Sequence, residues 1–366
     1  MTTRYPARSL VRRSLIGVAV LAATAGAAQA QNVTLFGRLD VGFQFTNKVN
    51  PAGDSLSELK NGGILPSIWG MRGSEDLGNG LKAVFNLESD FGGDTGGSRG
   101  LGSISSAFGR QANVGLSGGF GTVLLGRQYS PAIIAELGTD PRGYKESYSM
   151  LLPYALTQAP AGNDVGPNNG LGIFTSNLVS YSNSFGPVNL GVAYGFGEVA
   201  GDNSAGRTIS LGLSYSGPVV VSFSYQTIRG LGVGADDETK RLGVGLAVPL
   251  GDFTIKGLFA KAEYESPGVP TDKVDNFGVG ADWRWSPANS ATLALYQGKN
   301  KGIADGTTRS IVLSNDHSLS KRTVLYGQFV HVDRDINAGA ETSIAAGGTP
   351  AGQKASIINV GIKHDF

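Results

Sequence analysis

The residues with the most evident chemical potential in this 366-residue chain are acids in one stretch, residues 130–172. The stretch carries the carboxylates Glu136, Asp140, Glu146 and Asp164. The chain has no cysteine, and no HExxH, GxSxG, P-loop or EF-hand pattern accompanies these acids. No residue pattern for acid–base or nucleophilic catalysis accompanies these acids, so we expect no enzymatic activity.

Metal, cofactor and nucleic-acid chemistry find little support in the sequence. The three histidines, His317, His331 and His364, show no ligand spacing, so we predict no metal site and no cofactor. The formal net charge is +1, which gives no argument for binding nucleic acid.

The first thirty residues have the pattern of a removable secretory signal. A positive region ends at Arg13, an apolar run follows over 15–23, and Ala28-Gln29-Ala30 matches a cleavage site. A membrane anchor, the alternative, needs about 20 apolar residues. We predict removal of residues 1–30, which leaves a single domain, residues 31–366.

The rest of the chain alternates between apolar and polar residues with a period of two. In residues 33–45, for example, Leu35, Leu39 and Phe43 share one face, whereas Arg38 and Asp40 share the other. Residues 81–91 and 357–366 repeat the pattern, and about sixteen such segments follow one another. The segments are long enough for tilted strands that cross a bilayer.

The connections between these segments alternate in length. Seven short turns, for example 118–121, 184–187 and 249–252, alternate with eight longer polar connections, near 47–63, 92–106, 130–172, 198–206, 229–238, 265–272, 299–307 and 334–353. Short turns at one rim and long loops at the other are typical of an outer-membrane β-barrel. We predict an all-β, 16-stranded antiparallel transmembrane barrel whose third long loop, 130–172, folds into the lumen and narrows it.

A soluble all-β fold, such as a sandwich or a β-helix, remains the structural alternative, because soluble strands alternate too. Long strands, export without cysteine, and aromatic residues near segment ends favour the membrane barrel. The aromatic residues include Phe43, Trp69, Tyr129, Trp283 and Phe366.

Several motifs, in order, resemble the general porins of Gram-negative outer membranes, especially the beta-proteobacterial type. They are residues 33–40 (VTLFGRLD), 69–78 (WGMRGSEDLG), 110–118 (RQANVGLSG), 121–128 (GTVLLGRQ) and 360–366 (VGIKHDF). The resemblance covers the whole mature chain. It implies a passive diffusion channel for small hydrophilic solutes and ions in the outer membrane, usually a homotrimer. Its terminal Phe366 looks like the signal that the outer-membrane assembly machinery reads, and its surroundings would be outer-membrane lipid and lipopolysaccharide.

The resemblance also implies which charges line the pore. Its positive wall corresponds to Arg38, Arg72 and Arg110, with Arg127 as a weaker candidate. The facing acids would be Glu136, Asp140 and Glu146 on the loop. Within the period-two alternation, Arg38 and Arg72 fall on a polar face, whereas the face of Arg110 is ambiguous. Each arginine could instead be a solvated charge at the rim of the barrel.

Two positions depart from the family pattern, since Ile68 and Phe174 stand where relatives often carry arginine. The wall of positive charges is then thinner than usual.

The alternative functions are a substrate-specific channel on the same barrel, an outer-membrane enzyme and a soluble adhesin. A specific channel would need a ladder of aromatic or basic residues along the lumen.

Overall fold

The computed structural model describes residues 32–98, 107–157, 173–231, 235–302, 305–345 and 349–366. The predicted signal segment, residues 1–30, and Asp164 lie outside these ranges. The elements, in chain order, are β1 (Asn32–Thr46), β2 (Leu56–Asn61), β3 (Ile68–Gly78), β4 (Leu81–Asp90), β5 (Gln111–Gly118), β6 (Gly121–Tyr129), α2 (Pro131–Glu136), α3 (Leu151–Leu156), β7 (Phe174–Phe185), β8 (Val188–Gly195), β9 (Thr208–Ser216), β10 (Val220–Arg229), β11 (Glu238–Leu250), β12 (Phe253–Ser266), β13 (Val269–Ser286), β14 (Asn289–Lys301), β15 (Gly306–Ser318), β16 (Thr323–Arg334), η3 (Ala340–Thr342) and β17 (Lys354–Asp365).

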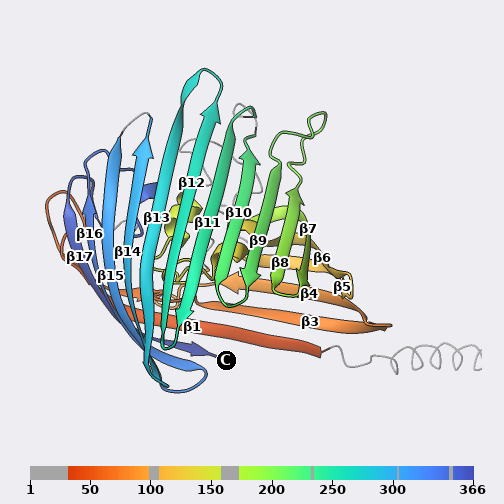
Figure 1. The fold of residues 1–366 in the computed structure, drawn as a ribbon, viewed down its shortest axis with the longest axis horizontal. Helices are drawn as coiled ribbons and strands as arrows, with labels where there is room; N and C mark the ends of the chain where they lie inside the picture. Colours follow the sequence, from red (N-terminus) through yellow and green to blue (C-terminus); the bar gives the residue numbers. More distant parts are fainter. Residues whose placement is uncertain (1–31, 99–106, 158–172, 232–234, 303–304, 346–348) are drawn as a thin grey trace, which may run out of the picture.

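The strands form one antiparallel sheet that closes on itself where β1 pairs with β17. β2 and β3 both pair with β1, one along each half of it, and so together they form a single barrel strand. The seventeen segments therefore make sixteen barrel strands, which confirms the predicted fold class. Figure 1 shows the strands side by side, with the yellow helical segments of residues 130–157 seen between the strand walls.

Some of the predicted connections are partly strand. Residues 47–63 include β2, Leu56–Asn61, which pairs with β1. Residues 265–272 do not form a long loop, because β12 runs to Ser266 and β13 starts at Val269. Alternating residues beyond the expected strand ends keep pairing, with a register shift between Tyr264 and Ser266. The polar composition of this stretch fits strands that project beyond the apolar belt.

The two faces of the sheet differ as the period-two pattern requires. On β1, Leu39 and Phe43 are exposed, whereas Asp40 and Gln44 between them are buried. Residues 130–157 hydrogen-bond to the Asp40 face of β1, β9, β11 and β16, through Gln44, Ser210, Arg241 and Gln328. One short segment reaches opposite walls of a closed sheet only from within, so this is the inner face.

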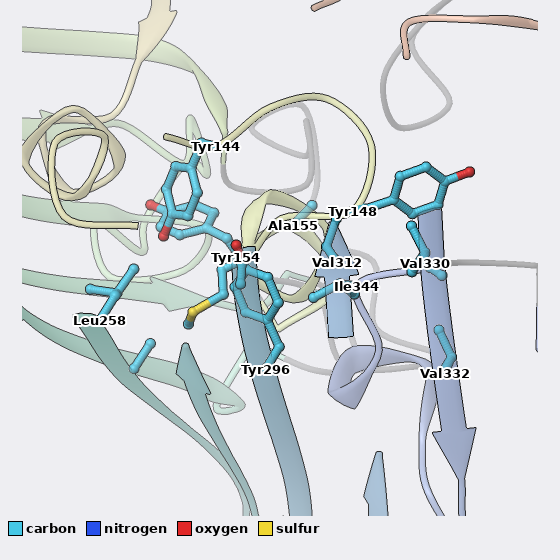
Figure 2. Close-up of a cluster of buried hydrophobic side chains, with 14 of the residues drawn as sticks. Tyr144, Tyr148, Tyr154, Ala155, Leu258, Tyr296, Val312, Val330, Val332 and Ile344 are labelled. Atoms are coloured by element: carbon cyan, nitrogen blue, oxygen red, sulfur yellow. The ribbon is translucent and has the colours of Figure 1, made fainter. Parts of the chain in front are cut away.

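Part of the inner face is apolar, which a water-filled barrel does not predict. Val312, Val330 and Ile357, on β15, β16 and β17, are fully or almost fully buried. They belong to one cluster with Tyr144, Met150 and Tyr154. These three residues come from residues 130–157, which we call the inner loop. Ile344, from the connection after η3, joins the same cluster (Figure 2). The inner loop therefore covers the wall from β12 to β17, and the apolar residues there are its packing surface.

The loop begins with a capped helix. Ser130 caps α2 by accepting a hydrogen bond from the Ile133 amide, and Pro131 occupies the first turn, where no amide hydrogen is needed. Helix α2 packs against β8 to β11. No helix in the described residues is both long and apolar enough to cross a membrane.

Glycines on the inner face let α2 approach the wall closely. A Cβ atom on Gly212 would lie 2.0 Å from the Pro131 carbonyl oxygen, and one on Gly243 would lie 2.1 Å from the Glu136 carboxylate. Such distances are far below van der Waals contact, so the wall positions under the helix require glycine.

We predict that Gly212→Ala loosens the inner loop. Overpacking costs about 1–3 kcal/mol, so trypsin should cleave the folded variant after Arg142 or Lys145 about tenfold faster. Gly257→Ala is the control, because its Cβ would meet only the Gly278 carbonyl oxygen, at 3.7 Å. Equal cleavage of both variants would contradict close packing of α2 on the wall.

Candidate functional site: a charged cavity between the inner loop and the first strands

A cavity of about 510 Å³ lies between the inner loop and the wall formed by β1, β3 and β4. Arg38, Arg72 and Arg110 line it, and Glu146 borders it from the loop. The structure therefore brings together three of the four arginines, and one of the three loop acids, that the sequence singled out.

Arg38 lies on the inner face of β1, and its Nε atom is 2.6 Å from Oδ1 of Asp365 on the paired strand β17. The other Asp365 oxygen accepts a hydrogen bond from Lys363, at 2.5 Å. Two cations thus share one carboxylate, and the Arg38 charge is partly neutralised.

Arg72 reaches the same cavity from β3. Its register partners are Thr34 and Asn86, and the β1 partner shares a face with Arg38. The guanidinium lies 5.1 Å from the centre of the Phe36 ring. Among the described residues, no carboxylate lies within ion-pair distance of this exposed guanidinium, so its charge is available to solutes.

Arg110 lies just before β5, outside the paired strand, which settles which face of the sheet it occupies. Val114 and Leu116, which share its parity, are exposed on the outer face. Arg110 itself is buried, with its Nε atom 2.5 Å from Oε1 of Glu88. Its guanidinium also lies 4.7 Å from the centre of the Phe174 ring. A residue outside the paired strand is free to point inward against the alternation.

Arg127 is buried in the wall and does not line this cavity. Gly126 has a φ of +115° beside a register shift, which turns Arg127 away from the regular alternation. Its Nε atom donates to the Gly109 carbonyl at 2.6 Å, and Nη1 donates to Ser176 Oγ at 2.8 Å. Its contacts tie neighbouring segments of the wall together.

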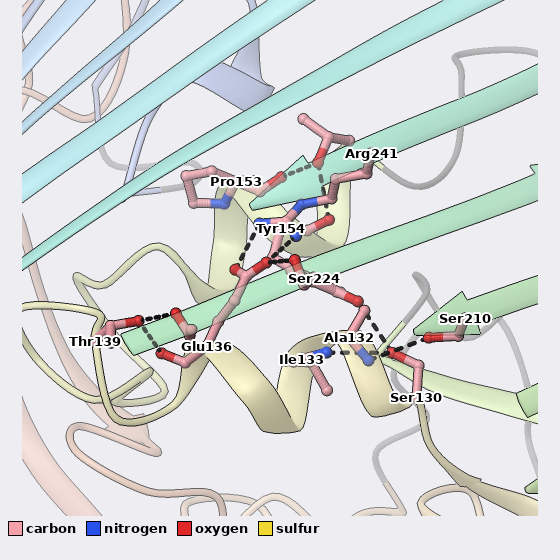
Figure 3. Close-up of polar contacts among 12 residues, drawn as sticks. Ser130, Ala132, Ile133, Glu136, Thr139, Pro153, Tyr154, Ser210, Ser224 and Arg241 are labelled. Carbon is pink, nitrogen blue, oxygen red and sulfur yellow. Dashed lines mark hydrogen bonds and ion pairs between the residues drawn. The ribbon is translucent and has the colours of Figure 1, made fainter. Parts of the chain in front are cut away.

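Glu136 differs from the expected pore-facing acid, because it is completely buried. Its two oxygens accept hydrogen bonds from Nη1 and Nη2 of Arg241 on β11, at 2.5 and 2.8 Å. Ser224 and Tyr144 donate to the same carboxylate, and the network links α2 to the wall (Figure 3). The Arg241 guanidinium also lies 4.0 Å from the centre of the Tyr154 ring. Glu136 is therefore the anchor of the loop.

Asp140 is also buried, inside the loop itself. Its oxygens accept hydrogen bonds from the backbone amides of Arg142 and Tyr144, at 2.9 and 3.0 Å, and of Met150, at 3.3 Å. Burial raises the pKa of its carboxyl group to about 6, against the opposing effect of these amides. The carboxylate organises the turn and does not face the cavity.

The loop's partners on the far wall are not among the residues that the sequence singled out. Arg241 was not selected, although its position alternates with Thr239 and Gly243 on one face. Arg142 was missed as well. It is buried and donates to Ser314 Oγ at 2.9 Å and to Gln328. An arginine that alternates with small residues on one face was the available signal for Arg241, but nothing in the sequence identifies its partner Glu136, which lies 105 residues away.

Phe366 ends the chain at the short-turn rim. Its backbone pairs with Gly37 of β1 through two hydrogen bonds, of 3.0 and 3.1 Å. The ring lies over Gly37, where a Cβ atom would be 2.2 Å from it. The last residue therefore completes the seam that closes the barrel.

Known proteins share both the sequence and this architecture. A family model described as "Gram-negative porin" matches residues 17–337. The chain is a Gram-negative porin. It is 31% identical to outer membrane porin protein 32 of Delftia acidovorans, over 97% of this chain and 100% of the relative. An outer membrane porin protein of Bordetella pertussis is 30% identical, over 86% of this porin and 93% of the relative.

A solved structure described as an anion-selective porin from Comamonas acidovorans superposes on this porin with a TM-score of 0.79. The two are 30% identical, and the match covers 92% of this chain and 100% of the other. These findings confirm the resemblance to outer-membrane porins, which are channels rather than enzymes, and place this porin in the outer membrane.

We predict that Glu136→Gln opens the inner loop. Breaking a buried pair leaves the Arg241 charge uncompensated, which costs about 3–5 kcal/mol. The measurement is the rate of trypsin cleavage within residues 137–157 of the folded protein. Glu136→Gln combined with Arg241→Met should recover much of the protection, because no charge then remains buried without a partner.

Asp333→Asn is the matched control for this prediction. Its pair with Lys354 is 2.7 Å long and much more exposed, and such pairs contribute about 0–1 kcal/mol. The anchoring role of Glu136 fails if Glu136→Gln and Asp333→Asn are cleaved at the same rate.

Proposed function

We propose that this porin is a passive diffusion channel whose narrowest part is the cavity between Arg38, Arg72, Arg110 and the inner loop. The proposal rests on Arg72, which is exposed in a cavity between the barrel wall and an anchored loop and has no ion-pair partner in the part of the chain that the structure describes. Low-dielectric walls focus the field of such a charge along the path of an ion. No bond is made or broken, and the channel needs no cofactor.

The charges that line the cavity give the channel weak selectivity. Three arginines are matched by three carboxylates, Glu88, Glu146 and Asp365. Two of these acids are paired with Arg110 and Arg38. Arg72 is exposed and makes no ion pair with the described residues, so it is the cation that a passing anion meets most readily, in keeping with the name of the anion-selective Comamonas relative.

We also propose how the chain is exported and assembled. Residues 1–30 would be removed as a signal peptide, and Phe366 would serve as the assembly signal. A homotrimer in contact with lipid and lipopolysaccharide is the expected form, and one Vibrio cholerae structure with the same fold is described as a trimer.

Planar-bilayer recordings test the channel. We expect stepwise openings in multiples of three and weak anion preference in reversal potentials. Arg72→Gln should shift the chloride-to-potassium permeability ratio toward potassium by about fivefold at low salt, the size of one charge acting through water at 4 Å.

Arg309→Gln is the matched control, because Arg309 is exposed on β15 at outer-face parity and should leave the ratio unchanged. Absence of any channel from heat-modifiable, folded protein would overturn the proposed function.

A further inference from the structure

Arg72 differs from the other two arginines of the cavity in having an uncommitted charge. Arg38 and Arg110 have carboxylate partners at 2.6 and 2.5 Å. Arg72 makes no ion pair among the described residues; its guanidinium lies over the Phe36 ring and is exposed. A planar guanidinium with free N–H groups is suited to bind a carboxylate through two hydrogen bonds.

Apolar side chains also face the water-filled space, which is unusual for a porin interior. On α2 and just after it, Ile134 is 54% exposed and Leu137 is 44% exposed, although the other side of the helix is buried. Leu137 and Phe36 line the cavity that contains Arg72. This surface is neither the packing face of the loop nor part of its anchor.

The apolar and basic surfaces are continuous. A second cavity, toward the short turns, shares Arg72 with the first and is also lined by Leu124. A third shares Leu124 with the second and is lined by Ile134. A solute that leaves Arg72 therefore passes aliphatic side chains next.

The charge balance restricts the kind of anion. Glu88, Glu146 and Asp365 line the same cavity as the arginines. Arg38 and Arg110 are already paired with Asp365 and Glu88, so a second carboxylate on the solute would have to compete for these cations, whereas a single carboxylate needs only Arg72. An apolar body gains from contact with Phe36 and Leu137 when it leaves water.

We propose that this cavity is a selectivity site for monocarboxylates that carry an aromatic ring or a short hydrocarbon chain. The carboxylate binds Arg72, and the apolar body lies against Phe36 and Leu137. The inference rests on the proposed channel function and deepens it by naming the solute class. Binding at such a site favours entry and slows the chloride that follows.

The test is block of the chloride current through the full-length porin in planar bilayers. Sodium benzoate is compared with acetate, with the neutral benzyl alcohol and with the dianion phthalate. We expect benzoate to halve the single-channel current at about one-tenth of the acetate concentration, the effect of burying part of a ring. Benzyl alcohol and phthalate should each need a higher concentration than benzoate to halve the current.

Two variants separate the basic half of the site from the apolar half. Leu137→Ser should bring the half-blocking concentration of benzoate close to that of acetate. Arg72→Gln should bring it close to that of benzyl alcohol. Leu319→Ser and Arg309→Gln are the matched controls, since both side chains are exposed away from the cavity, and both should retain the preference for benzoate.

Equal block by benzoate and acetate, or unchanged benzoate block in Leu137→Ser, would overturn the proposed apolar contact. Block by phthalate as strong as by benzoate would overturn the restriction to monoanions. Each of these three results requires a working chloride channel. They are therefore distinct from failure of the proposed function, in which no chloride current flows.

Discussion

The closed hydrogen-bonded sheet is the constraint on which the rest of this porin depends. Inside a bilayer each backbone amide and carbonyl needs a protein partner, so the last strand must pair with the first. The seam between β1 and β17, extended by the two bonds between Gly37 and Phe366, meets this need. Closure also creates an interior, and the loop, its anchor and the cavity are all built on the inner face of the sheet.

The interior is asymmetric. Residues 130–157 cover the apolar inner wall from β12 to β17, where Val312 and Val330 are completely buried. The connection containing η3 adds to this cover, because Thr342 bonds Thr308 on β15 at 2.7 Å and Ile344 joins the buried cluster. The space that remains lies along the first strands and β6 to β9, where the three cavities are found. A loop anchored at Glu136 thus determines which wall the solutes meet.

The sequence predicted those features that depend on local alternation and on the order of motifs. The barrel, the number of its strands and the inward parity of Arg38 and Arg72 follow from a period of two. Contacts between segments that are distant in the chain could not be predicted from the sequence. Glu136 and Asp140 were expected to face the pore, yet their burial depends on Arg241, far along the chain, and on amides that the loop itself brings together. Arg110 and Arg127 lie at a strand end and beside a bulge, where alternation gives no direction.

Cysteine labelling tests most directly whether the inner loop leaves one wall of the barrel open and covers the other. The chain has no cysteine, so each introduced thiol is unique. Asn86→Cys lies on the open wall, and Val312→Cys lies on the covered wall. A water-soluble methanethiosulfonate reagent should modify Asn86→Cys rapidly and reduce the channel current, while Val312→Cys stays unmodified. Equally rapid reaction at both positions would show that the inner loop does not cover the wall that contains Val312.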